Sequence, residues 1–256
     1  MTEQIKDNNR KVVIELQNVK RDFRVGDETV HALRGVSFTI REGEFVTIMG
    51  KSGSGKSTLL NQLGCLDTPS SGEYYLEGVS VRTMSKAQRA TLRNRKIGFI
   101  FQNYNLLPKT TSVENVELPL MYNPDVSAVE RNERAVEALK AVGLGERLYH
   151  KSNQMSGGQM QRVAIARALV NNPAVILADE ATGNLDTRTS FEILVLFQKL
   201  HAEGRTIIFV THNPDIARYS SRNIQLRDGR VISDEYNHDV MSAAEGLAAL
   251  PANADE

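Results

Sequence analysis

A segment rich in glycine and serine has the residue types and the spacing to bind phosphate groups. Its residues, Gly50-Lys51-Ser52-Gly53-Ser54-Gly55-Lys56-Ser57, match the pattern G-x4-G-K-[S/T]. Glycines let several backbone N–H groups turn toward one concentrated negative charge, and the helix that follows adds the positive end of its dipole. Lys56 can reach the β- and γ-phosphates of a nucleotide, and the hydroxyl of Ser57 can bind Mg²⁺. A flexible linker could share this composition, but the segment lies between a buried-strand pattern and a helix pattern, as a phosphate loop requires.

Two adjacent carboxylates follow the apolar run Val175–Ala178 and are suited to nucleotide hydrolysis. A carboxylate at the end of a strand beside the phosphate loop, here Asp179, can hold Mg²⁺ directly or through water. The next residue, Glu180, is placed to orient the attacking water or to accept its proton. An acidic turn after a core strand would look the same by itself, so it is the pairing with the phosphate loop that favours a catalytic role.

Two further features would complete such a site. A second glycine-rich turn, Ser156-Gly157-Gly158-Gln159, precedes a helix pattern and could bind another anion, although a flexible loop with a helix cap has the same sequence. His212 lies just past the strand pattern Ile207–Val210. A single histidine is usually structural, but the γ-phosphate of a nucleotide would lie at this end of such a sheet.

These residues need a sheet and helices to bring them together. Alternating apolar residues predict half-buried strands at 13–18 and 36–40, and continuous apolar runs predict buried strands at 45–49, 97–101, 175–178 and 207–210. Helical patterns occur at 56–66, 85–95, 159–171 and 190–202. Glu77-Gly78 and Asp228-Gly229 predict hairpin turns. The order of these patterns predicts an α/β core with a helical subdomain inserted into it.

The middle and the end of the chain carry further helix signals. Ser127 and Glu130 have the spacing of a capping box, which predicts a helix N-terminus. The apolar residues expected on one face of that helix are Val129, Val136, Leu139 and Val142. Gly143 is placed to end the helix. From Asn237 onward the alanine-rich sequence predicts a short helix followed by a frayed end.

The composition limits the classes of function. The chain has 256 residues, of which 41% are apolar and 24% charged, so a sizeable core is possible. Its 31 basic and 31 acidic residues balance, which gives no support for a long nucleic-acid-binding surface. The single cysteine, Cys65, excludes an internal disulfide and is interpreted as a small buried hydrophobe. No signal-peptide core and no run of about 20 apolar residues is visible, so any link to a membrane is expected through a partner.

The four features, in this order, resemble the ATPase cassettes of the ABC-transporter family over roughly residues 12–235. In that family the Ser-Gly-Gly-Gln turn is the discriminating motif, and here Met155 precedes it where leucine is usual. The resemblance implies an α/β fold: a P-loop NTPase (RecA-like) core with an N-terminal antiparallel β subdomain and an inserted α-helical subdomain at about 103–168. It divides the chain into a polar N-terminal tail at 1–11, the ATPase domain at 12–236 and a C-terminal tail at 237–256.

The resemblance also implies the cofactors ATP and Mg²⁺ and the residues that use them. The residues implied in hydrolysis are Lys56, Glu180 and His212, and those implied in Mg²⁺ binding are Ser57, Gln102 and Asp179. Ala181 departs from the proline that is usual after the catalytic glutamate. This change should loosen the turn slightly and leave the chemistry intact.

Contacts with the nucleotide are implied at further positions. Phe23 matches the aromatic residue that stacks on adenine, although an ordinary core phenylalanine is the alternative. Gln102 would also couple the site to a membrane partner, and Asp186 lies in the loop that crosses between two cassettes. The full implied set is Phe23, Gly50, Lys51, Ser52, Gly53, Ser54, Gly55, Lys56, Ser57, Thr58, Gln102, Ser156, Gly157, Gly158, Gln159 and Asp186.

Longer matches resemble the subgroup that serves lipoprotein release and macrolide export, the LolD and MacB type. They include Leu63-Gly64-Cys65-Leu66-Asp67, Phe101-Gln102-Asn103-Tyr104-Asn105-Leu106-Leu107-Pro108 and Thr182-Gly183-Asn184-Leu185-Asp186. Members of this group serve lipoprotein extraction, drug or peptide export and antimicrobial-peptide defence, which the motifs do not separate.

The resemblance implies two partners, a second copy of the chain and an integral membrane permease subunit. The location implied is cytoplasmic, peripheral on the inner membrane through the permease. In the hypothetical dimer each ATP lies between the 50–57 loop of one copy and the 156–159 turn of the other. Two alternatives remain open: a cassette that drives a permease-like partner in signalling or cell-wall remodelling, and an ATPase of DNA repair or translation. The second is disfavoured because the insert at 103–168 is too short for a coiled coil and the chain holds one cassette.

Overall fold

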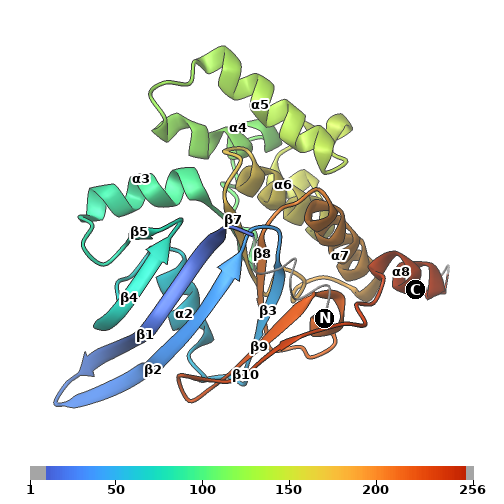
Figure 1. Cartoon of the computed structure of the whole chain (residues 1–256). Helices are drawn as coiled ribbons and strands as arrows, with labels where there is room; N and C mark the ends of the chain where they lie inside the picture. Colours follow the sequence, from blue (N-terminus) through green and yellow to red (C-terminus); the bar gives the residue numbers. More distant parts are fainter. Residues whose placement is uncertain (1–9, 252–256) are drawn as a thin grey trace.

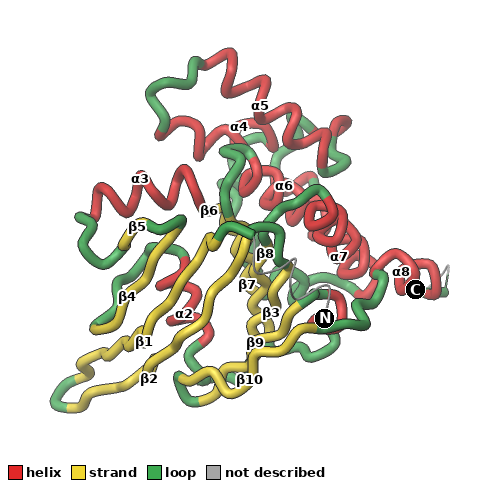
Figure 2. The backbone as a smooth tube through the Cα atoms, viewed as in Figure 1, coloured by secondary structure: helices red, strands yellow, loops and turns green. Residues whose placement is uncertain are grey.

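The computed structural model describes residues 10–251, and within them a six-stranded sheet forms the centre (Figures 1 and 2). Its strand order is β10-β9-β3-β8-β7-β6, and the strands from β9 to β6 run parallel. The strands are β3 (Phe45–Met49), β6 (Ile97–Ile100), β7 (Val175–Asp179), β8 (Ile207–Thr211), β9 (Arg222–Arg227) and β10 (Arg230–Tyr236). The inner strands β3, β7 and β8 are buried along nearly their whole length, as expected for parallel strands covered on both faces.

A second sheet, four-stranded in the described part of the chain, is antiparallel and has the order β2-β1-β4-β5. The strands are β1 (Val12–Val25), β2 (Glu28–Arg41), β4 (Ser71–Leu76) and β5 (Val79–Ser80). The strands β1 and β2 are much longer than the predicted 13–18 and 36–40. Register shifts at Leu16/Val19 and Arg21/Asp22 change which residues face the core. The simple alternation that predicts a strand therefore ends before the strand does.

Helices and the two sheets enclose two hydrophobic clusters. The helices are α2 (Lys56–Leu63), α3 (Lys86–Lys96), α4 (Ser112–Glu117), α5 (Ala128–Ala141), α6 (Gly157–Leu169), α7 (Thr187–Ala202) and α8 (Ala243–Ala249), with 3-10 turns η1 (Leu118–Tyr122), η2 (Gly145–Arg147), η3 (Ser152–Gln154) and η4 (Ile216–Tyr219). One face of the central sheet packs with α2 and the antiparallel sheet. The other face packs with α4, α5, α6 and α7, and Figure 1 shows α4 and α5 at the end of the molecule beyond α6.

The first helix after the phosphate loop is shorter than predicted. The helix α2 ends at Leu63 rather than at residue 66, because Cys65 adopts a left-handed conformation with φ 54°. The backbone N–H of Leu66 then turns back to the carbonyl of Asn61 at 2.9 Å. The chain thereby leaves the helix toward β1.

Side-chain caps move the start of two later helices. The helix α6 begins at Gly157 rather than at residue 159, because Ser156 caps it and draws the glycines into the first turn. The helix α7 begins at Thr187 rather than at residue 190, because the carboxylate of Asp186 accepts a bond from the third residue of the helix. Both caps lie at positions that the sequence marks as functional.

The prediction for α5 is partly wrong. Ser127 accepts the N–H of Glu130 at 3.2 Å, but the reciprocal bond of a capping box is missing, since the Glu130 carboxylate pairs with Arg134 one turn later. Val129 is 69% exposed rather than part of the buried face. It lies in the first turn, and the buried residues of α5 lie in later turns. The first turn therefore extends beyond the core.

Both predicted hairpin turns are confirmed. Glu77 and Gly78 have φ values of 49° and 79°, and Asp228 and Gly229 have 48° and 75°. Two successive positive φ values are the signature of the turn that matches the twist of antiparallel strands.

The two ends of the chain are described in part. The helix α8 confirms the short helix predicted after Asn237, whereas the predicted frayed end lies outside residues 10–251. The predicted N-terminal tail at 1–11 also lies outside them, apart from Arg10 and Lys11. No helix in the described range is long and apolar enough to cross a membrane.

Candidate functional site

The loop Gly50–Ser57 connects the buried strand β3 to the N-terminus of α2. The ammonium of Lys56 donates to the carbonyl oxygens of Gly50 at 2.6 Å and Lys51 at 3.1 Å, so the lysine lies across its own loop. The first N–H groups of α2 and the positive end of its dipole point into the same loop. The arrangement concentrates positive potential at one point, which is what a phosphate group requires.

A neighbouring hairpin supports the phosphate loop from outside. The N–H of Gly229, in the turn between β9 and β10, donates to the carbonyl of Ser54 at 2.9 Å. The carbonyl of Gly229 accepts the N–H of Arg34 at 2.8 Å, which ties the turn to β2 as well. The sequence predicts this turn but not its partner, because the contact joins residues far apart in the chain.

The carboxylates and the histidine meet at the edge of the sheet where β3, β7 and β8 end. Met49 pairs with Thr211 across β3 and β8, and Asp179 pairs with Val210 across β7 and β8. Parallel strands in this register place their C-terminal ends side by side. Residues 179–180 and 212 are therefore brought to the edge from which the phosphate loop leaves β3.

Asp179 lies in a low-dielectric environment beside the loop. Burial raises the pKa of its carboxyl group, the negative charge of Glu180 raises it further, and the ammonium of Lys56 partly lowers it. A carboxylate that is costly to ionise gains from a nearby cation. A cation bound near Asp179 would therefore stabilise its ionised form.

Glu180 and His212 form a hydrogen-bonded pair. The Nδ1 atom of His212 lies 2.6 Å from Oε1 of Glu180, and the side chains are 64% and 21% exposed. Glu180 has a left-handed backbone with φ 45°, which is uncommon for a residue with a side chain. Its N–H bonds to the carbonyl of Val210 at 2.9 Å, and its carbonyl accepts the N–H of Gly183 at 2.8 Å. The unusual conformation is held from both sides.

Gln102 lies after β6 and contacts the loop that follows Glu180. Its Nε2 donates to Oδ1 of Asn184 at 3.2 Å, while Nδ2 of Asn184 donates to Oδ1 of Asn103 at 2.8 Å. Asp186, in the same loop, accepts the N–H of Thr189 at 2.8 Å, and its bonds to Thr189 lower the pKa of its carboxyl group. The sequence does not predict this role of Asn184, because the contact joins two loops that only the fold brings together. A cavity of about 650 Å³ opens beside this loop and is lined in part by Glu180 and His212.

The Ser156–Gln159 turn forms a complete capping box. Oγ of Ser156 accepts the N–H of Gln159 at 3.3 Å, and Oε1 of Gln159 accepts the N–H of Ser156 at 3.1 Å. The turn packs against Tyr104, Leu185 and Thr189. Within one chain its contacts are therefore with the 102–105 and 183–189 segments rather than with the phosphate loop.

Phe23 lies on β1 with 37% of its surface exposed, so it is not part of the described core. It pairs with Val30 of β2, two residues from Ala32, whose carbonyl oxygen lies against Gly55 of the phosphate loop. At a rise of about 3.3 Å per residue, Val30 and Ala32 are roughly 7 Å apart along β2, so Phe23 belongs to the part of the sheet beside the phosphate loop. The guanidinium of Arg21 lies 4.5 Å from the ring centroid.

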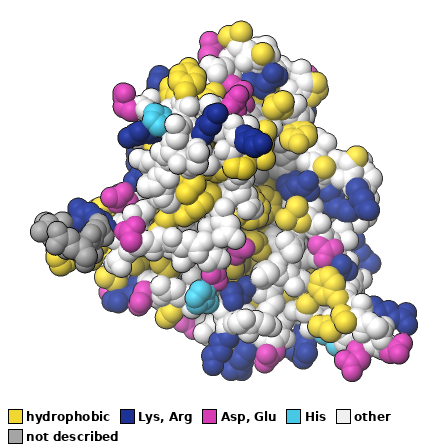
Figure 3. Space-filling view, turned by 180° about the vertical axis from the view of Figure 1, so that it is seen from behind, with side chains coloured by type: hydrophobic (Ala, Val, Ile, Leu, Met, Phe, Trp, Pro, Cys, Tyr) yellow, Lys and Arg dark blue, Asp and Glu magenta, His cyan; other side chains and the backbone are white. Residues whose placement is uncertain are grey.

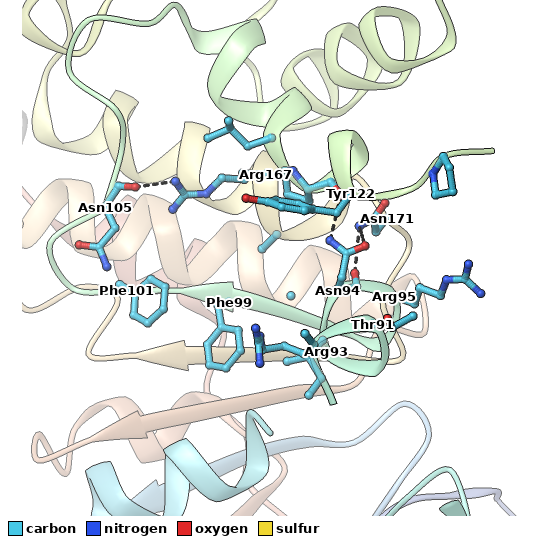
Figure 4. A pocket seen from close by; sticks show the side chains of 17 residues that line it. Thr91, Arg93, Asn94, Arg95, Phe99, Phe101, Asn105, Tyr122, Arg167 and Asn171 are labelled. Atoms are coloured by element: carbon cyan, nitrogen blue, oxygen red, sulfur yellow. Dashed lines mark hydrogen bonds between the residues drawn. The ribbon is translucent and has the colours of Figure 1, made fainter. Parts of the chain in front are cut away.

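A groove of about 760 Å³ lies between α3, β6 and η1 (Figure 4). Its apolar lining includes Phe99, Phe101, Leu118, Pro119 and Tyr122. The rings of Phe99 and Phe101 stack with their centroids 5.4 Å apart. Residues of α3 and β6 line one side of the groove, and residues of η1 and α6 line the other.

Cationic side chains border the same groove. They are Arg93, Arg95 and Arg167. Arg167 donates to the carbonyls of Asn105 at 2.6 Å and Tyr104 at 2.7 Å, and burial lowers its pKa. These bonds connect the groove to the segment that follows Gln102.

Comparison with known proteins gives consistent matches. Residues 33–183 match the family described as ABC transporter. An uncharacterized ABC transporter ATP-binding protein of Thermotoga maritima is 57% identical over 221 residues, 86% of this chain and 94% of the relative. The macrolide export ATP-binding/permease protein MacB of Syntrophobacter fumaroxidans is 53% identical over 219 residues, 85% of this chain but 31% of that longer protein.

Solved structures match as well. The dimeric structure of the cassette MJ0796, a protein of Methanocaldococcus jannaschii, has a TM-score of 0.79 and 48% identity, covering 87% of this chain and 98% of that chain. A dimeric post-hydrolysis state of MJ0796, bound to ADP and phosphate, has the same TM-score and 47% identity.

Proposed function

Because the chain belongs to the ABC transporter family and is an ATP-binding cassette that hydrolyses ATP, we propose that it powers a separate membrane permease, for export or for lipoprotein release. The observation that carries the catalytic part of the proposal is the Glu180–His212 pair at 2.6 Å beside the phosphate loop. In this proposal the carboxylate and the imidazole would lie where the γ-phosphate and the attacking water meet.

In the proposed mechanism the phosphate loop holds the nucleotide and Glu180 acts on water. The backbone N–H groups of residues 50–58 and the ammonium of Lys56 would bind the β- and γ-phosphates and stabilise the charge that develops during transfer. Glu180 would orient the attacking water and accept its proton, and His212 would fix the carboxylate and contact the γ-phosphate. Phe23 would stack on the adenine ring.

The proposed metal is Mg²⁺ bound together with the nucleotide. Ser57, Gln102 and Asp179 offer hydroxyl, amide and carboxylate oxygens, the ligands that this ion prefers. The raised pKa of Asp179 fits a carboxylate that gains a cation. Within residues 10–251 no group of three His, Cys, Asp or Glu residues could hold a metal alone. Phosphate oxygens of the nucleotide would therefore complete the coordination shell of Mg²⁺, and the ion would neutralise part of their negative charge.

The proposed assembly is a head-to-tail homodimer. The N-terminus of α6, with Gly157 and Gly158 in its first turn, favours an anion, yet in one chain it packs against the 183–189 segment. A second copy with twofold symmetry would bring each such turn to the partner's phosphate loop and complete two sites at once. The dimeric structures of MJ0796 support this assembly.

The proposed docking surface for the permease is the groove between α3 and η1. Its aromatic floor and arginine border suit an amphipathic helix that carries acidic residues. The bonds of Arg167 to Tyr104 and Asn105 would pass movement of that helix to Gln102. The MacB relatives, which are named ATP-binding/permease proteins, support a permease partner. In this proposal the cassette acts at the inner membrane from the cytoplasmic side.

The alternative is a cassette that drives a permease-like partner in signalling or cell-wall remodelling without cargo. It would use the same groove and the same hydrolysis. A nucleic-acid partner is disfavoured, because acidic and basic side chains are interspersed on the face shown in Figure 3 and the net charge is zero.

Two variants test the catalytic proposal. Glu180→Gln should still bind ATP and should accumulate an ATP-bound dimer in size-exclusion chromatography while hydrolysis stops. Lys56→Ala should weaken ATP binding itself, measured by calorimetry. Normal hydrolysis by the first variant would refute the role of Glu180, and unchanged affinity in the second would refute the role of Lys56.

A further inference from the structure

Gln161 lies in the second turn of α6 and is fully buried, with 0% of its surface exposed. Its Nε2 donates to the carbonyl oxygen of Ala181 at 2.8 Å. Its Oε1 atom has no hydrogen-bond partner among the described residues. A buried amide that satisfies only one of its two ends stabilises a fold less than an apolar side chain of the same size. Packing therefore does not explain a glutamine here, and the bond to Ala181 is what the side chain contributes.

The acceptor of this bond belongs to the turn that positions Glu180. Ala181 follows Glu180 directly, is itself buried, and imposes no restriction on its own φ angle. Glu180 has a left-handed φ of 45°, a conformation that must be held by its surroundings. The bonds of Glu180 to Val210 and Gly183 hold its own N–H and carbonyl groups. The bond from Gln161 fixes the next peptide, so the orientation of the Glu180 carboxylate depends on α6.

We propose that Gln161 is a positioning residue for ATP hydrolysis, which holds the Ala181 carbonyl and thereby aims Glu180 at the attacking water. The inference rests on the proposed catalytic role of Glu180. It also has a consequence for the proposed dimer. The helix that carries Gln161 begins at the Ser156–Gln159 turn, which would face the partner's nucleotide. One hydrogen bond would then connect contact with one ATP to hydrolysis of the other.

The first test removes the donor at nearly constant volume. Gln161→Met should lower kcat about tenfold or more, because small displacements of a catalytic group are costly. The affinity for ATP should stay within about twofold, since the phosphate loop is untouched. An unchanged kcat would overturn the proposal. An equal loss of ATP affinity would also overturn it, because it would show a general defect of the fold.

The second test restores a hydrogen-bond donor at position 161 by protonating a carboxyl group. In Gln161→Glu, burial should raise the pKa of the new carboxyl group, and its protonated form can donate to Ala181 as the amide does. The ratio of its kcat to that of the wild type should rise as the pH falls from about 8 to 6, whereas the ratio for Gln161→Met should stay flat. The charged groups of α6 and of the elements packed near it, namely Arg162 with its partner Glu192 and Glu180 with its partner His212, are shared with the wild type, so the ratio removes their own titration. A flat ratio for Gln161→Glu would overturn the proposal.

A double variant separates hydrolysis from assembly. Glu180→Gln combined with Gln161→Met should form the ATP-dependent dimer as well as Glu180→Gln alone. Failure to form it would mean that Gln161 acts on assembly rather than on the catalytic turn, and the proposal would fall. If Glu180→Gln alone hydrolysed ATP normally, the proposed role of Glu180 would fail first. That result differs from one in which Gln161→Met keeps the normal kcat while Glu180→Gln loses hydrolysis, which would overturn the role of Gln161 alone.

Discussion

The contact between the β9–β10 turn and the phosphate loop predicts an effect of a distant glycine on ATP binding. Gly229 has φ 75°, and a Cβ added to it would lie 2.6 Å from the carbonyl oxygen of Ala32 and 3.2 Å from Cα of Leu33. The same glycine donates to the carbonyl of Ser54 at 2.9 Å. Gly229→Ala should therefore push the turn away from β2 and disturb the phosphate loop.

A matched glycine serves as the control. Gly78 has φ 79° in a turn of the same type, and a Cβ there would meet nothing within 4 Å. Both alanine variants carry the strain of a left-handed residue, about 1–2 kcal/mol. Only Gly229→Ala adds a clash with backbone, which costs about 1–3 kcal/mol when neighbours must move. The free energy of unfolding should thus fall by about 2–5 kcal/mol in Gly229→Ala and by about 1–2 kcal/mol in Gly78→Ala.

The effect on the nucleotide follows from the bond to Ser54. Losing one backbone hydrogen bond of about 1 kcal/mol would weaken ATP binding about fivefold. Calorimetry should therefore show a higher Kd for Gly229→Ala and an unchanged Kd for Gly78→Ala, with thermal unfolding recorded for both. Equal Kd and equal Tm values in the two variants would refute the reasoning. Equal Kd values with different Tm values would refute the link to the phosphate loop.

Three further predictions concern buried polar groups. Arg222→Met should lower the free energy of unfolding in urea by about 3–5 kcal/mol, because it removes the positive charge that lies 3.0 Å from the buried carboxylate of Glu44; a loss below about 1 kcal/mol would contradict this. Burial raises the pKa of the Cys65 thiol to about 11. Its rate of reaction with a disulfide reagent should therefore rise about tenfold per pH unit up to that value, whereas the rate of an exposed thiol levels off near pH 8.5, and such levelling at Cys65 would contradict this. Asp179→Asn should stabilise the nucleotide-free protein at neutral and alkaline pH, where the carboxyl group of Asp179 is ionised, and should weaken Mg²⁺-dependent ATP binding. The raised pKa of Asp179 in the wild type means that ionisation of this carboxyl group destabilises the folded state. This penalty vanishes as the pH falls below the pKa that the group has in the unfolded chain. Unchanged stability of the variant in thermal unfolding would exclude this effect.

The sequence predicts local features of the site because their signals are local. The pattern at residues 50–57 places the phosphate loop between β3 and α2, and the apolar runs place β7 and β8. Turn residues such as Asp228 and Gly229 identify a hairpin, since two positive φ values demand them. In each case the physical cause lies within a few residues of the feature.

Other parts of the site depend on contacts that a linear pattern does not contain. The extent of β1 is hidden because bulges interrupt its alternation. The length of α2 depends on the left-handed Cys65, which the helical pattern does not reveal. The bonds from Gly229 to Ser54 and from Gln161 to Ala181 join segments that the fold brings together. The groups proposed to do the chemistry have local signals in the sequence, whereas the contacts that hold them in place depend on the fold.

The distance between the two side chains proposed to act in hydrolysis is set by the core of the sheet. Glu180 directly follows Asp179, the last residue of β7, and His212 directly follows Thr211, the last residue of β8. Because Asp179 pairs with Val210, the register of these buried strands fixes how far apart Glu180 and His212 lie. A slip by one residue would shift the glutamate by about 3.3 Å and turn the apolar side chains of the strand to the opposite face. Burial on both faces makes that slip costly. The hydrophobic pattern that folds the sheet therefore also determines the geometry of the Glu180–His212 pair.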